Sequence, residues 1–278
     1  RHADVGRRGE HEGAEQHRQQ LQRWAPQWAL DQIQQHARAS AVRHLILKEA
    51  LHEVAVAAEW LQLKVVVLKG GSRLFGASGQ PPQIPGDLDL YVESASAEKL
   101  RNYLLAHGFQ GPSQSRCGAS HHLAPIYWKG IPLEIHHRLM PTFWGLPEAE
   151  MLNHLVPLEL HDARLWTLSP EGELLLTMVH CSKHLYSHGL KAGWALRQLL
   201  ASGCDGQVLA RWVARLPYPR SFWIPWLHFR ELLDLDNPDG LIPPTRSWQD
   251  RYLWEIASRR LYSRADCVES VNPFLRLG

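Results

Sequence analysis

Residues 68–90 read LKGGSRLFGASGQPPQIPGDLDL, and they set the architecture of this chain. An apolar segment ends at the glycine turn Gly70-Gly71, and 15 residues separate this turn from the acidic motif Asp87-Leu88-Asp89. Side chains on a strand alternate between its two faces, so both aspartates are expected on one face and Leu88 on the core face. Paired carboxylates beside a glycine turn are typical of metal-dependent transfer of phosphoryl or nucleotidyl groups.

The elements around this stretch predict a small mixed sheet with helices on it. Apolar periodicity and turn residues indicate helices over 21–61, a strand over 64–68, a short helix over 72–75, a loop over 77–85, a strand over 87–92, a helix over 94–107, and strands over 122–128 and 131–139. The last two strands are joined at Lys129-Gly130, a plausible hairpin turn.

The chain after Pro141 is expected to be helical, with helical spacing over 174–185, 194–200 and 208–216 and short helices in the Trp-rich tail. We therefore predict an α+β fold, in which a small mixed sheet with flanking helices is followed by a helical domain. The expected parts are a disordered or non-native extension over 1–20, a catalytic-type α/β domain over 21–140 and a helical domain over 141–278.

The composition excludes several classes of protein. With 45% hydrophobic and 21% charged residues and a net charge of +2, nothing in the overall charge favours nucleic-acid or membrane binding. The four cysteines form no CxxC pair, which argues against a disulfide framework and predicts a cytoplasmic protein. No apolar run reaches the roughly 18 residues of a membrane span, and residues 1–20 lack the apolar region of a signal peptide.

Three motifs carry a resemblance to a known family. In chain order they are Leu68-Lys69-Gly70, then Gly86-Asp87-Leu88-Asp89-Leu90, and then a glycine, Gly130, followed by the strand Pro132-Leu133-Glu134-Ile135-His136. In this order they resemble the polymerase-β-type nucleotidyltransferase superfamily, and in particular its poorly characterised bacterial branch. The resemblance covers residues 50–200. The spacing between the glycine turn and the first aspartate, 15 residues, is longer than is usual in the superfamily.

The resemblance implies the roles of the site residues. Two magnesium ions would be held by three acids, Asp87, Asp89 and Glu134. The triphosphate of an NTP co-substrate would be positioned by the turn and its cations, Lys69, Gly70, Gly71, Ser72 and Arg73. His136, on the same strand face as Glu134, would orient Glu134, accept a proton or bind metal.

Each of these features has a structural alternative. The DLD motif can be a solvated strand, the glycine turn a plain strand-to-helix connection, and His136 a hydrogen-bonded support residue. A further helix carries His180, Lys183, His184 and His188, and its three histidines share one stripe. This stripe would line the cleft that faces the sheet or, the favoured choice, form a solvated or interdomain polar face. Tryptophans in the tail favour core packing over base stacking on nucleic acid.

The predicted activity is magnesium-dependent transfer of a nucleoside monophosphate from an NTP to a hydroxyl-type acceptor, with release of pyrophosphate. The acceptor could be a small molecule, a peptide, a protein side chain or RNA, with nucleic acid the less favoured choice. Two other readings stay open: a non-catalytic nucleotide-binding or regulatory module on the same scaffold, and an interaction protein whose helical half docks a partner.

Overall fold

The computed structural model describes residues 25–74, 84–113, 120–160, 163–184, 190–245 and 247–262. The predicted extension over residues 1–20 and most of the predicted loop over 77–85 lie outside these residues. The chain divides into two compact units, Arg1–Ile46 and Leu47–Gly278. Helix α2 (Gln27–Leu61) begins in the first unit and ends in the second, where all of its buried residues lie.

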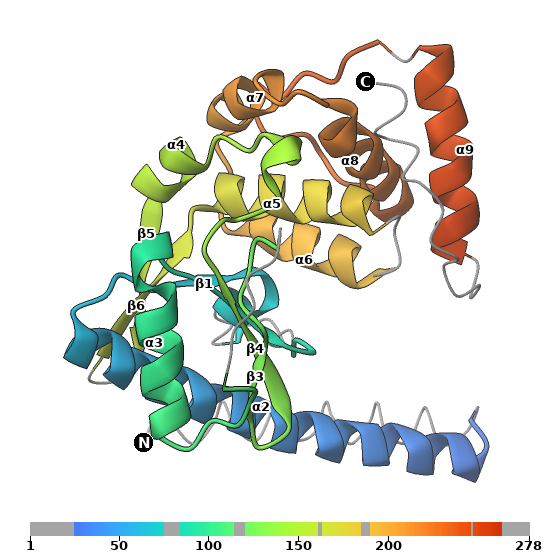
Figure 1. Cartoon of the computed structure of the whole chain (residues 1–278). Coiled ribbons are helices and arrows are strands. Elements are labelled where there is room, and N and C mark those ends of the chain that lie inside the picture. Colours follow the sequence, from blue (N-terminus) through green and yellow to red (C-terminus); the bar gives the residue numbers. More distant parts are fainter. Residues whose placement is uncertain are drawn as a thin grey trace, which may run out of the picture. The chain divides into compact units, whose positions relative to one another are not determined.

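The second unit contains a six-stranded mixed sheet, which confirms the predicted fold class (Figure 1). The strands are β1 (Val66–Leu68), β2 (Leu88–Tyr91), β3 (Ile126–Trp128), β4 (Ile131–His136), β5 (Leu155–Leu160) and β6 (Ala163–Leu168). Their order across the sheet is β3-β4-β2-β1-β6-β5. β1 is antiparallel to β2 and parallel to β6, whereas β2 is parallel to β4.

Two hairpins form the outer parts of this sheet. The β3–β4 hairpin turns at Lys129 and Gly130, whose φ angles of 48° and 82° are the positive values that a two-residue hairpin turn requires. The β5–β6 hairpin corrects the expectation that the chain is helical throughout after Pro141, because residues 155–168 are two strands of the sheet. The two strands are short and partly exposed, so they give a weak local signal beside the strong helical pattern that follows.

Most helices after α2 lie within a few residues of the predicted ranges, but the short helix expected over 72–75 begins at Lys69, and those over 142–144 and 148–153 were not predicted individually. The helices after α2 are the 3-10 helices η1 (Lys69–Arg73) and η2 (Thr142–Trp144), and the α-helices α3 (Ser94–Ala106), α4 (Glu148–Asn153), α5 (Pro170–Lys183), α6 (Leu190–Ala201), α7 (Gly206–Ala214), α8 (Arg220–Leu233) and α9 (Trp248–Tyr262). In the part of the chain that the structure describes, none of them is long and apolar enough to cross a membrane.

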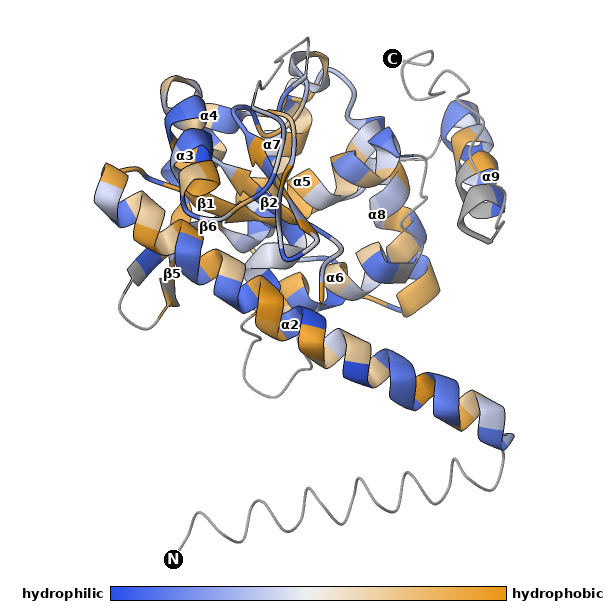
Figure 2. Cartoon of the chain, turned by 60° about the horizontal axis from the view of Figure 1, so that its bottom comes forward, coloured by the Kyte–Doolittle hydropathy of each residue, from blue (hydrophilic) through white to orange (hydrophobic). Residues whose placement is uncertain are grey.

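Helix α5 is the centre of the helical part. It begins with Ser169 as its cap and Pro170 in its first turn, and its residues 171–179 are all buried. It packs against α6, α7, α8, η1 and β6, and hydrophobic residues gather on the strands and on α5 (Figure 2). One hydrophobic core joins Val66 and Leu68 of the sheet with Trp226 of α8, so Trp226 serves packing, as the sequence favoured.

Candidate functional site

Two neighbouring parallel strands bring the predicted acids together. In the register of β2 and β4, Asp89 lies opposite Glu134, and His136 follows two residues later on the same face of β4. One ligand atom from each of these three side chains lies within 4.8 Å of the others. Carboxylate oxygens and an imidazole nitrogen in this arrangement could hold a divalent metal ion.

Asp89 is the most constrained member of this cluster. Its side chain is 6% exposed, and its Oδ1 accepts hydrogen bonds from Lys69 Nζ at 3.0 Å and from His136 Nε2 at 2.8 Å. Burial on its own would raise the pKa of the Asp89 carboxyl, but the charge of Lys69 and the hydrogen bond from His136 hold that pKa well below its usual range. Asp89 is therefore an ionised, acceptor-only group.

The contact with Asp89 determines which ring nitrogen of His136 is the donor. An ionised carboxylate can only accept, so Nε2 of His136 carries a proton and points between Asp89 and Glu134, whose Oε2 lies 3.6 Å from it. Nδ1 of His136 is buried without a partner among the described residues. Histidines that bind metal normally donate their other ring N–H to an acceptor. His136 thus fits better as a donor that holds the two carboxylates than as a ligand itself.

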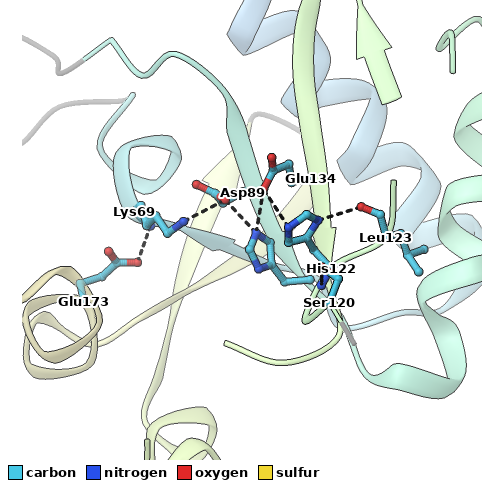
Figure 3. A network of polar contacts seen from close by, with 8 residues as sticks. Lys69, Asp89, Ser120, His122, Leu123, Glu134 and Glu173 are labelled. Atoms are coloured by element: carbon cyan, nitrogen blue, oxygen red, sulfur yellow. Dashed lines mark hydrogen bonds and ion pairs between the residues drawn. The ribbon is translucent and has the colours of Figure 1, made fainter. Parts of the chain in front are cut away.

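Glu134 extends from the buried end of the cluster toward solvent, with its side chain 29% exposed. The contact with His136 lowers the pKa of the Glu134 carboxyl, burial opposes this, and His122 lowers it further. The Nε2 atom of His122 lies 3.9 Å from Glu134 Oε2, while its Nδ1 donates to the carbonyl oxygen of Leu123 at 2.9 Å. Glu134 is therefore ionised and directed into the site (Figure 3).

His121 and His122 are site residues that the sequence reasoning missed. The rings of His121, His122 and His136 have centroids between 4.8 and 5.3 Å apart. Burial, followed by the charge of Lys183, lowers the pKa of His121 to about 3, so this imidazole is neutral. The adjacent pair of histidines before the β3–β4 hairpin is the only local signal, and no motif marks it.

Asp87 has a different position from the one expected. β2 begins at Leu88, so Asp87 lies just outside the strand and the alternation argument does not apply to it. It nevertheless lines the same cavity as Asp89 and Glu134. Burial and then the charge of Asp89 raise the pKa of the Asp87 carboxyl, as expected for acids that share one site.

The glycine turn forms the 3-10 helix η1, and Glu173 of α5 fixes it. Lys69 has a φ of 51°, and its backbone N–H donates to Glu173 Oε1 at 3.0 Å. The guanidinium of Arg73 lies 3.5 Å from Glu173 Oε2, and Ser72 Oγ donates to the carbonyl of Lys69 at 2.7 Å. The sequence contains no motif that reveals Glu173, because its partners lie about a hundred residues earlier.

The predicted phosphate-binding residues divide into two groups. Lys69, Gly70 and Arg73 line the cavity, whereas Gly71 and Ser72 do not. Gly71 is buried, and a Cβ at this position would lie 2.8 Å from Val67 Cγ1. Packing alone therefore requires glycine at position 71.

The cavity has a volume of about 590 Å³ and is lined by two groups of residues that differ in their chemistry. The sheet contributes the carboxylates and histidines described above. The opposite wall comes from α5 and α6 and contains His180, Lys183, His184 and Lys191. The helical histidine stripe therefore lines the cleft, apart from His188, which lies outside the described residues.

Comparison with known proteins identifies the family. A family model described as "Uncharacterised nucleotidyltransferase" matches residues 13–234. An antigenic nucleotidyltransferase-like protein from Paracoccidioides brasiliensis has a TM-score of 0.43 and 17% identity over 59% of this chain and 79% of that chain. The antibiotic-resistance factor ANT(2'')-Ia has a TM-score of 0.41 and 12% identity over 56% of this chain and 83% of that chain. No curated protein matches. The chain belongs to a family of uncharacterised nucleotidyltransferases.

Proposed function

We propose that the protein is a magnesium-dependent nucleotidyltransferase, which transfers a nucleoside monophosphate from an NTP to a hydroxyl-type acceptor and releases pyrophosphate. The observation that carries this proposal is the cluster of Asp89, Glu134 and His136 at a cavity whose opposite wall is cationic. Acids on one side and lysines on the other suit a substrate that is both metal-bound and polyanionic.

The metal would be held by Asp87, Asp89 and Glu134, with two magnesium ions as the family resemblance implies. When bound, the metal supplies charge neutralisation at the phosphates and acidifies the acceptor hydroxyl. His136 holds Asp89 and Glu134 in place through its Nε2–H. Because His136 contacts the carboxylates, its role in this proposal is to position them.

The triphosphate would contact the wall that carries the cations. Lys69, Gly70 and Arg73 line the cavity on the η1 side, and Lys183 and Lys191 line it on the helical side. Burial, followed by the nearby charge of Lys69, lowers the pKa of Lys183. Binding of phosphates at this wall would relieve that crowding of positive charge. Gly71 and Ser72 would support η1 from outside the cavity.

The acceptor, the nucleotide base and the cytoplasmic location stay predictions. The cavity offers polar groups of both signs, which suits a small molecule, a peptide, a protein side chain or RNA. Residues from both 21–140 and 141–278 line the cavity, so the proposed site needs both parts of the chain. Strands β5 and β6 carry the sheet into the second part.

Calorimetric titration of each of the four NTPs, with and without magnesium, tests this proposal. The wild type is expected to bind one or more of them in a magnesium-dependent manner, and Glu134→Gln and Asp87→Asn/Asp89→Asn are expected to lose that dependence. Glu49→Gln is a matched control, because Glu49 is also a carboxylate paired with a lysine but does not line the cavity.

Turnover separates catalysis from binding alone. A folded wild type that binds no NTP under any condition would refute the proposal. Magnesium-dependent binding without pyrophosphate release, against a panel of small-molecule, peptide, protein and RNA acceptors, would instead support the non-catalytic nucleotide-binding module.

A further inference from the structure

The ammonium group of Lys69 forms an ion pair with Asp89, the most buried carboxylate of the candidate metal site. Its Nζ lies 3.0 Å from Oδ1 of Asp89, and the same oxygen accepts from His136. Figure 3 shows Lys69 between Asp89 and Glu173, with its side chain directed toward one and its backbone toward the other. An ionised carboxylate that is 6% exposed needs a compensating charge, and Lys69 is the cation in direct contact with it among the described residues.

The backbone of Lys69 is held in place, while its side chain has room to turn. Glu173 accepts the Lys69 N–H, and Ser72 Oγ donates to the Lys69 carbonyl. The side chain is 19% exposed and lines the cavity, so the four-carbon stem can move its ammonium group from Asp89 toward the cavity without a change in η1. The backbone of Lys69 is therefore fixed by hydrogen bonds, whereas its ammonium group can move.

A divalent cation and the Lys69 ammonium would compete for the same carboxylate group, that of Asp89. A metal bound by Asp89 and Glu134 would repel the ammonium group of Lys69, and the burial of Asp89 limits how far water can screen this repulsion. The lysine must then leave Asp89, and it needs a new anionic partner in the cavity. The phosphates of a nucleotide are anions of this kind, and three further cations, Arg73, Lys183 and Lys191, also line the cavity.

We propose that Lys69 pairs with Asp89 in the absence of ligands and so competes with the metal for this carboxylate. When a nucleotide binds, the Lys69 ammonium group moves from Asp89 to the phosphates, so that metal and nucleotide bind cooperatively. This inference rests on the proposed function, because it assumes that the cavity binds a metal and a nucleotide. Lys69 would thereby couple the binding of metal to the binding of nucleotide. Metal alone binds weakly, and metal together with nucleotide binds tightly, as a coupling between two sites requires.

The test is the affinity of the full-length protein for Mn²⁺ alone, measured from the free-ion signal in electron paramagnetic resonance. Lys69→Met is expected to bind Mn²⁺ at least about 10-fold more tightly than the wild type, because the competing charge is gone. Lys69→Arg keeps a cation at this position and is expected to keep the weak wild-type affinity. The matched control Lys129→Met removes a lysine that is paired with Glu49 away from the cavity, and it should also match the wild type.

The second arm measures nucleotide binding in the absence of metal. Lys69→Met is expected to weaken it, although the same variant strengthens Mn²⁺ binding. A lysine that only stabilised the fold would not change the two affinities in opposite directions. Thermal unfolding of each variant checks that the protein is folded, and Mn²⁺ should raise the unfolding temperature of Lys69→Met more than that of the wild type.

Two results would overturn the inference. One is a folded Lys69→Met variant whose Mn²⁺ affinity is equal to or weaker than that of the wild type. The other is an equal gain of affinity in Lys69→Arg, because the charge would then not be the cause. These failures are distinct from failure of the proposed function, in which the wild type itself binds no nucleotide with magnesium.

Discussion

At the scale of single residues, the candidate site depends on how buried carboxylates are kept ionised and in place. Asp89 has two direct donors, Lys69 and His136, and Glu134 has His136 at 3.6 Å. His136 contacts both acids through Nε2, so it links β2 and β4 at the position where Asp89 and Glu134 lie side by side. Nδ1 of His136 has no hydrogen-bond partner among the described residues, so Nε2 makes the polar contacts of this ring.

Replacement of His136 tests this role. His136→Leu removes the donor and is expected to lower metal affinity and turnover by about 10- to 100-fold, as for other residues that orient metal ligands. His136→Gln can place an amide N–H near the same position and is expected to retain much of both. Mn²⁺ titration and pyrophosphate release measure the effect, with the exposed His107→Gln as the control. Equal losses in the Leu and Gln variants would contradict a role as donor.

Glu173 predicts a dependence of stability on pH. Burial raises the pKa of its carboxyl to about 7 from an ordinary value of 4.5, although Arg73 and the Lys69 N–H lower it. Between these two values the unfolded chain has lost the proton and the folded chain retains it. The free energy of unfolding should therefore fall as the pH rises from 4.5 to about 7 and level off above it, by on the order of 1–3 kcal/mol from this group.

Chemical denaturation at a series of pH values measures this decline. Glu173→Gln keeps an acceptor for the Lys69 N–H but cannot ionise, so its unfolding free energy should decline less over the same range. Glu171→Gln removes an acid from the same turn of α5 and controls for the change in net charge. Parallel pH profiles for the wild type and Glu173→Gln would show that Glu173 is already ionised in the folded protein at the acid end.

At the scale of elements, the site is built where η1 meets the ends of β1 and β2. Gly70 and Gly71 permit this close approach, because Cβ atoms there would lie 2.8 Å from atoms of Pro85 and Val67 respectively. The same glycines were predicted to cradle phosphates. The contacts give them a structural reason that holds with or without a ligand.

Two alanine substitutions test whether packing requires a glycine at position 71. In Gly71→Ala the new methyl group meets Val67 at 2.8 Å and Leu88 at 3.3 Å, so the variant is expected to lose about 1–3 kcal/mol of stability. Gly86→Ala is the matched control, because nothing lies within 4 Å of its added Cβ. Denaturant unfolding compares the two, and an equal effect in both variants would mean that the contact at position 71 relaxes without cost.

Sequence reasoning succeeds where the signal is local and fails where it depends on distant contacts. The strand before the glycine turn, the turn itself, the DLD strand and the Lys129-Gly130 hairpin are each determined by fewer than about ten neighbouring residues, and all were predicted. Glu173 was missed because its partners, Lys69 and Arg73, lie about a hundred residues away. His122 was missed for a similar reason, because only the pairing of its segment with β4 brings it to Glu134.

Strands β5 and β6 were missed because their own sequences are ambiguous. The segment 155–160 contains Pro157, which is unfavourable inside a sheet and is tolerated here because β5 is the edge strand. Segment 163–168 directly precedes α5, whose apolar residues are much more numerous. The pairing of β6 with β1, nearly a hundred residues earlier in the chain, decides its conformation.

At the scale of the whole second unit, sheet and helices share one core. β1 lies between β2 and β6, so its two edges pair with parts of the chain from either side of residue 140. Val66 and Leu68 belong to the same hydrophobic cluster as Leu174 and Leu175 of α5. The two parts of the chain are therefore expected to fold as one cooperative unit, even though they contribute opposite walls of the cavity.

Separation of the chain after Met140 tests this expectation. The part ending at residue 140 loses β6, so β1 becomes an edge strand and the apolar residues that α5 covers are exposed. Neither part is expected to unfold cooperatively alone, and each should bind a hydrophobic dye. When the two are mixed they should associate, because β1–β6 pairing and the shared core re-form, and the mixture should regain a cooperative transition. Cooperative unfolding of both separate parts would instead establish two independent domains with a boundary near residue 140.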